Sequence, residues 1–220
     1  MTIKRILKRD SFGVVRLETH GLGLAVARDT GAAIWGAQWL AKKLARREAE
    51  ALLRVGDQQG LPALISFDGK LLRRSYLPGL VMYEAKPKSS QYFADALKLL
   101  CRIHRRGVAH NDLAKEANWL CMPGGKPAIV DFQIAFVSRR RGRLFRLLAR
   151  EDLRHLLKHK QHYLRGSLTT RQRALLANPS LPARIWRVAV KPPYWFVTRR
   201  ILRWPERDGP QERGTRGERD

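Results

Sequence analysis

Five polar residues in the middle of the chain have the types and spacing that chemistry on phosphate groups requires. His110, Asp112, Lys115 and Asn118 fall within nine residues, and Asp131 follows at the end of an apolar run. A carboxylate can orient a hydroxyl and take its proton, and Mg²⁺ prefers hard oxygen ligands such as carboxylates and amides. A lysine can offset negative charge on a phosphate. Side chains of these types are what phosphoryl transfer needs.

The elements around this stretch follow from the apolar pattern. Residues 90–107 are predicted to form a helix, because apolar residues recur there at helical spacing. Residues 108–112 are short and extended. Residues 119–121 and 128–131 are predicted to form a hairpin around Pro123-Gly124-Gly125. The polar residues would then lie on a loop and at a strand end.

The N-terminal part of the chain is dominated by strand patterns. A helix, or two shorter ones, is predicted over residues 32–55, with Leu40, Leu44, Ala51 and Leu52 on its packed face. Two hairpins are predicted: residues 12–17 with 22–28 around His20-Gly21, and residues 63–67 with 71–77 around a type I′ turn at Asp68-Gly69. Helices are predicted again over residues 144–164 and 171–177. Strands early and helices late predict an α+β fold with two lobes.

The central stretch resembles the catalytic loop and metal-binding motif of the protein-kinase-like superfamily. Residues 108–120 read VAHNDLAKEANWL and residues 128–133 read AIVDFQ. Members of that superfamily carry H-x-D, then Lys, then Asn, then a strand that ends in D-F-G or a variant. The resemblance implies a two-lobed protein-kinase-like fold, with a small β-rich N-lobe in residues 1–79 and a reduced helical C-lobe in residues 80–204. Residues 205–220 are predicted to be a disordered tail.

The resemblance also implies roles for the polar residues. Asp112 would be the catalytic base, His110 would brace the loop, and Lys115 would offset charge on the transferred phosphate. Asn118 and Asp131 would bind Mg²⁺. Asn118 comes six residues after Asp112, where the family has five, and we interpret this as one extra residue between Asp112 and Lys115.

The resemblance implies that ATP is held by the N-terminal part. Gly13 would belong to a phosphate loop with one glycine, and Arg28 takes the place of the strand lysine. For the helix glutamate that pairs with this cation, Glu48 and Glu50 are the alternatives. We prefer Glu48 because a packed face continues beside it. Residues 71–79 resemble the strand and hinge that line the adenine pocket, although an ordinary strand and turn explain them as well.

The charge of the chain predicts an anionic partner. There are 44 Lys and Arg residues against 19 Asp and Glu, a net charge of +25. Residues 138–204 alone hold 18 Lys or Arg and 2 Asp or Glu, a net charge of +16. This excess attracts nucleic acid, phosphorylated glycans or anionic lipid. The two cysteines are too few for a disulfide framework, which favours a reducing compartment.

The chain has no A-P-E motif, and its C-terminal part is short. In these features it resembles small prokaryotic relatives: lipopolysaccharide core (Kdo/heptose) kinases, RIO-type kinases and aminoglycoside-phosphotransferase-like enzymes. We favour the first group, whose acceptor hydroxyl belongs to a lipid-linked sugar; a protein Ser/Thr hydroxyl is the other acceptor considered. Residues 180–204 interleave aromatic and basic residues, which predicts contact with an anionic membrane, unless the aromatics pack as core. We expect a cytoplasmic protein. If residues 180–204 contact a membrane, we expect it to be peripheral on the cytoplasmic face of the inner membrane.

Two other classes of function fit the same sequence. One is a RIO-like ATPase associated with nucleic acid, although no nucleic-acid module is recognised and we favour this partner less. The other is a pseudokinase that binds a nucleotide without transferring phosphate, which Arg28 and the single glycine of the loop favour.

Overall fold

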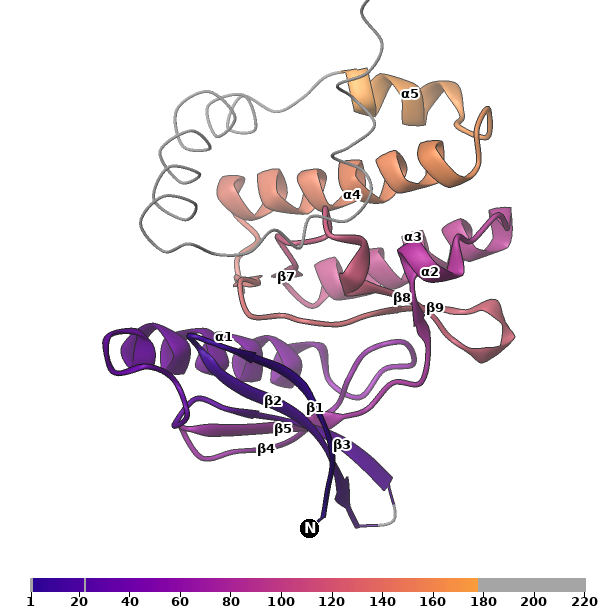
Figure 1. Ribbon diagram of the computed structural model, residues 1–220. Coiled ribbons are helices and arrows are strands. Elements are labelled where there is room, and N and C mark those ends of the chain that lie inside the picture. Colours follow the sequence, from indigo (N-terminus) through magenta and orange to yellow (C-terminus); the bar gives the residue numbers. More distant parts are fainter. Residues whose placement is uncertain (1, 22, 178–220) are drawn as a thin grey trace, which may run out of the picture.

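The computed structural model describes residues 2–21 and 23–177. A twisted antiparallel sheet with one long helix forms one part, and helices with two small sheets form the other (Figure 1). The predicted α+β class is confirmed. The predicted membrane segment, residues 180–204, and the predicted tail, residues 205–220, lie outside the described residues.

The main sheet has five strands in the order β1-β2-β3-β5-β4. The two predicted hairpins are present in it, but β1 was not predicted, because nearly all of its side chains are exposed and it has no apolar alternation. Its strand form depends on pairing with β2. The bounds are β1 Ile3–Asp10, β2 Gly13–His20, β3 Gly23–Asp29, β4 Leu64–Phe67 and β5 Leu71–Ser75.

The turn between β4 and β5 differs from the predicted type. The Asp68 amide and the Leu71 carbonyl are hydrogen-bonded, so Gly69 and Lys70 are the central residues. Only Gly69 has a positive φ, of 93°. A type I′ turn requires positive φ at both central residues, so the I′ prediction was wrong. The Asp68 carboxylate stabilises the turn by accepting from the amides of Lys70 and Leu71.

The long helix α1 (Gln38–Val55) is preceded by a 3-10 turn, η1 (Trp35–Ala37). Leu40 was predicted on the packed face and is exposed instead. The buried side of α1 consists mainly of alanines, which allow the helix to approach its neighbours closely. It lies against β4 and β5 and, through its second half, against the helical part.

The helical part confirms the three predicted helices, and a short one, α2, was not predicted. The predicted hairpin after the polar stretch is present as β8 and β9. The helices are α2 Met82–Ala85, α3 Ser90–Arg105, α4 Arg143–Tyr163 and α5 Thr170–Ala177. The short strands are β6 Leu80–Val81, β7 Val108–Ala109, β8 Trp119–Cys121, β9 Pro127–Ile129 and β10 Phe136–Val137, with 3-10 turns η2 Glu116–Asn118 and η3 Pro123–Gly125.

One hydrophobic cluster joins the two parts. Leu52 and Val55 of α1 share it with Leu100 and Ile103 of α3 and with Leu156 of α4. The second half of α1 is therefore fixed against the helices that carry the polar loop. Within residues 2–177, position 22 aside, none of the helices combines the length and apolar character needed to cross a bilayer.

Candidate functional site

The polar loop starts where β7 ends and closes around Asp112. The Asn118 side-chain amide donates to the Asp112 carbonyl at 2.9 Å and to its carboxylate at 3.0 Å. Lys115 Nζ lies 2.8 Å from the same carboxylate oxygen, Asp112 Oδ2. Asn118 therefore reaches Asp112 across the six-residue spacing.

The same loop is hydrogen-bonded to the residue before Asp131. His110 Nε2 lies 3.0 Å from the Val130 carbonyl, and the Val130 amide donates to the Asn118 carbonyl at 3.0 Å. The ring of His110 also packs on Phe132, with 4.6 Å between centroids. These contacts join the loop that carries Asp112 and Asn118 to Val130, the residue directly before Asp131 at the end of β9.

The sheet contributes a cation that reaches Asp131. Arg28 on β3 donates to the Glu48 carboxylate of α1 at 3.1 Å, and its Nη2 lies 3.6 Å from Asp131 Oδ1. Glu48 is fully buried and also lies 3.2 Å from Nε of Arg74 on β5. Glu50, the alternative partner, is exposed. Arg74 was not among the predicted residues.

Asp131 is in an unusual backbone and electrostatic state. Its φ is 68°, in the left-handed region that costs a non-glycine residue free energy. Burial raises its pKa, but Arg28, the Gln133 amide and Arg74 together hold the pKa below the usual range. The side chain is 33% exposed, so a carboxylate that stays charged is open to a ligand.

Gly13, the predicted phosphate-loop residue, lies at the start of β2 with a φ of 122°. A Cβ atom at this position would be 2.1 Å from the Asp29 carbonyl oxygen. Close packing of β2 on β3 therefore requires glycine here, whether or not a phosphate binds.

Helix α4 holds the start of the polar loop through Asp152, a residue the sequence analysis missed. The Asp152 carboxylate accepts from the amides of His110 at 2.8 Å and Asn111 at 2.9 Å. His104 Nε2 lies 3.1 Å from the same group. A signal existed: Asp152 is one of only two acidic residues in the basic segment 138–204.

Two further residues of α4 hold the rest of the loop. His159 Nε2 lies 2.8 Å from the Leu113 carbonyl, and burial is the main cause that lowers the pKa of His159. The Tyr163 hydroxyl donates to the buried Glu116 carboxylate at 2.7 Å. These residues and Asp152 follow one another along α4, which thus supports the loop from end to end.

The donor set fits Mg²⁺. Within the described ranges, no cluster of three or more His, Cys, Asp or Glu side chains could hold a metal by itself. Magnesium at phosphate-transfer sites takes few protein ligands, typically one or two carboxylates, and completes its shell with phosphate and water. Asp131 and the side-chain amide of Asn118 would supply oxygens of that kind.

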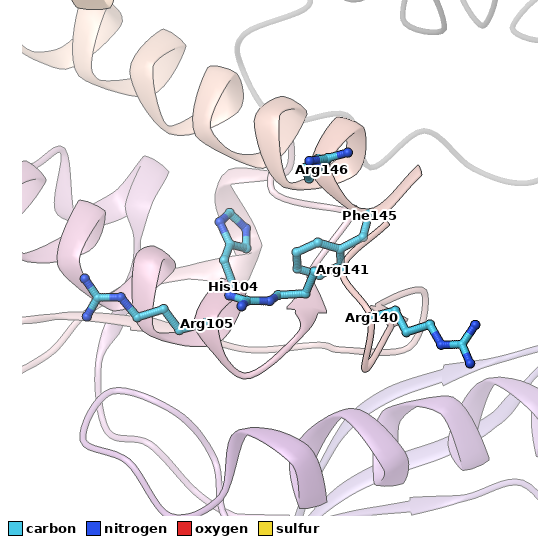
Figure 2. Close-up of a pocket in the computed structure, with 6 residues that line it drawn as sticks. All are labelled: His104, Arg105, Arg140, Arg141, Phe145 and Arg146. Atoms are coloured by element: carbon cyan, nitrogen blue, oxygen red, sulfur yellow. The ribbon is translucent and has the colours of Figure 1, made fainter. Parts of the chain in front are cut away.

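A cavity of about 360 Å³ lies between the end of α3 and the start of α4 and contains none of the predicted site residues. In Figure 2, Arg105 and Arg140 extend from its rim in opposite directions, so its guanidinium groups do not converge on one point. Four of its six lining residues are arginines. Its lining is His104, Arg105, Arg140, Arg141, Phe145 and Arg146.

A comparison of the sequence with known protein families finds no match, and a comparison with curated proteins finds no similar sequence. The site must therefore be interpreted from its own residues.

Proposed function

We propose that the protein is an ATP- and Mg²⁺-dependent phosphotransferase with a two-lobed, protein-kinase-like fold that transfers the γ-phosphate to a hydroxyl group. The observation that carries the proposal is that the loop with the paired Asp112 and Asn118 is hydrogen-bonded to Val130, directly before Asp131. Two carboxylates and an amide on adjoining segments are the protein contribution that magnesium-dependent phosphoryl transfer needs.

Each residue has a role that follows from its contacts. Asp112 has one carboxylate oxygen held by Lys115 and Asn118, which orients the group to accept the proton of the acceptor hydroxyl. Bound Mg²⁺-ATP supplies the phosphoryl group and neutralises part of its charge. Lys115, 65% exposed, can turn toward the transferred phosphate. His110 keeps the loop against Val130.

On the sheet side, Arg28 and Glu48 form the cation–glutamate pair of this proposal. The pair is buried and close to Asp131, so the guanidinium can contact a phosphate oxygen on the side opposite the polar loop. A planar guanidinium binds phosphate in a fork geometry that differs from the point contact of an ammonium. The glycine turn before β2 would lie over the phosphates.

The acceptor we favour is the hydroxyl of a lipid-linked, anionic sugar, with protein Ser/Thr as the other candidate. The net charge of +25 supports an anionic acceptor, because a positive field raises the local concentration of such a substrate. An acceptor screen with labelled ATP, covering lipid-linked sugars, the protein itself and generic protein substrates, separates the two.

The substitution Asp112→Asn tests the proposal, because it keeps the shape of the side chain but removes the carboxylate that would act as the base. We expect phosphate transfer to fall by about 100-fold or more, the usual contribution of general base catalysis. Asp95→Asn, at an exposed position of α3, is the matched control and should leave transfer unchanged. Equal loss in both variants, or no loss in Asp112→Asn, would contradict the proposal.

A second candidate, a nucleotide-binding module without transfer, is favoured by one contact. Arg28 Nη2 lies 3.6 Å from Asp131 Oδ1, where it competes with a metal ion for the carboxylate. In that case wild-type protein binds ATP equally with and without Mg²⁺, and Arg28→Lys gains magnesium dependence because the shorter side chain releases Asp131. For a phosphotransferase, wild-type binding already depends on Mg²⁺.

A further inference from the structure

An exposed apolar cluster lies at the start of α1, away from the candidate site residues. Trp35 is 92% exposed, Trp39 71% and Ile34 60%. Trp119, by contrast, is fully buried and donates its indole N–H to the Leu113 carbonyl. Large apolar side chains that gather on a surface without packing mark a site of interaction.

The cluster continues into a basic side of the helix. Trp39 and Lys43 are four residues apart in α1 and so lie on the same side. Lys43 Nζ lies 4.7 Å from the centre of the Trp39 ring. The buried side of the helix, which includes Ala41 and Ala45, packs on the rest of the protein. The aromatic and basic groups therefore face outward together.

Charge selects the kind of partner. Residues 30–47 contain four Lys or Arg and no Asp or Glu. A partner must therefore offer negative charge next to an apolar layer. Tryptophan is enriched where a bilayer meets water, because its ring is apolar and its N–H is polar. Basic residues near anionic headgroups add to the attraction.

The position of the cluster suits contact with a flat surface. In Figure 1 the first turns of α1 lie at the left edge of the part that contains the sheet, away from the helical part. The Ile34 amide donates to the Ser11 carbonyl at 3.2 Å, so the cluster adjoins the turn between β1 and β2. A surface bound here would lie beside that turn.

We propose that Ile34, Trp35 and Trp39, with Lys42 and Lys43, dock the protein onto the surface of an anionic lipid bilayer. The aromatic rings enter the headgroup region and the lysines contact lipid phosphates. The proposed docking residues include none of residues 180–204, and the proposal does not depend on the proposed phosphotransferase activity. If that activity is present, docking brings the turn before β2 next to lipid-linked acceptors.

The experiment uses the full chain and vesicles of equimolar phosphatidylcholine and phosphatidylglycerol, with pure phosphatidylcholine vesicles as the neutral arm. Trp35→Ser with Trp39→Ser should weaken co-sedimentation by about tenfold or more, because two rings stay in water. Lys42→Ala and Lys43→Ala should each weaken it by about fivefold, since a basic residue near the surface contributes about 1 kcal/mol. Leu53→Ser with Leu80→Ser, at exposed apolar positions outside the cluster, is the matched control and should bind like wild type.

A second measurement keeps the proposal testable if the double Trp variant does not fold. Wild-type tryptophan fluorescence should be quenched by brominated lipids, and Trp35→Phe with Trp39→Phe should reduce that quenching while retaining binding. Equal binding by the serine variants and the control would overturn the proposal. Equal wild-type binding to neutral and anionic vesicles would also overturn it. So would serine variants that bind vesicles like wild type but no longer form a dimer that wild type forms. Asp112→Asn should bind vesicles like wild type, so failure of the proposed chemistry and failure of docking can be distinguished.

Discussion

The two sides of the candidate site are held in different ways. On the helical side, Asp152, His159 and Tyr163 of α4 hold the polar loop by hydrogen bonds, most of them to its backbone. On the sheet side, Glu48 and Asp131 are held by ion pairs with arginines. Hydrogen bonds to the backbone fix a shape, whereas an ion pair can exchange partners when a charged ligand arrives. The helical side is thus a fixed support, and the sheet side is the part that can respond to a charged ligand.

The largest effect is expected on the helical side, from Asp152→Ala. The change leaves the buried His110 amide and the partly buried Asn111 bond without their acceptor, and an unsatisfied buried amide is costly. We expect the free energy of unfolding to fall by about 4 kcal/mol, measured by urea denaturation. Asp95→Ala, at an exposed pair with Lys98, is the control and should change stability by less than about 0.5 kcal/mol. Similar losses in both would mean that Asp152 does not anchor the loop.

The next effect is on the sheet side, from Glu48→Gln. Arg28 and Arg74, each with only 11% of the side chain exposed, lose their charged partner, and the expected cost is about 3 kcal/mol. Nucleotide binding should weaken as well, because Arg28 is no longer oriented. Glu50→Gln lies on the exposed side of the same helix and should be neutral in both assays. If Glu50→Gln has the larger effect, the pairing assigned to α1 is incorrect.

A smaller effect is expected from Tyr163→Phe, which removes the hydrogen bond to Glu116 at the far end of the loop. The free energy of unfolding should fall by about 1 kcal/mol. If the loop shifts, the proposed phosphate transfer should fall by a larger fraction than the stability does. Tyr83→Phe is the control, because the Tyr83 hydroxyl makes no hydrogen bond within the residues that the structure describes. Identical behaviour of the two variants would argue against a role for Tyr163.

The smallest effect near neutral pH is a pH dependence that comes from α4. Burial, with Lys158 and His159, lowers the pKa of His155 to about 4 from its usual 6.5. The unfolded chain therefore binds more protons between these values, so stability is complete above about pH 6.5 and falls as the pH decreases through the window. We expect the free energy of unfolding to fall by about 1 kcal/mol for each pH unit. Thermal unfolding at a series of pH values measures this slope. His155→Gln should flatten this slope, and an unchanged slope would assign it to other groups.

Much of the local structure could be predicted from the sequence, because it depends on local patterns. The helix over residues 90–107 follows from apolar spacing, and the hairpin after the polar stretch follows from Pro123-Gly124-Gly125; both are present. β1 could not be predicted, since its exposed residues carry no alternation and its pairing partner supplies the strand form. The exposure of Leu40 could not be predicted either, because alanines rather than leucines form the packed side of α1.

The order of residues along the chain determined by itself which side chains the proposed site would use: His110, Asp112, Lys115 and Asn118 share one short stretch, and Asp131 follows a later apolar run. It also determined the excess of positive charge. Only the tertiary structure decided that Glu48 rather than Glu50 meets Arg28, that Arg74 joins them, and that Asp152 supports the loop. The reason is physical: these partners are 20 to 42 residues apart. Packing of the whole core sets which faces meet, and no local pattern encodes that packing.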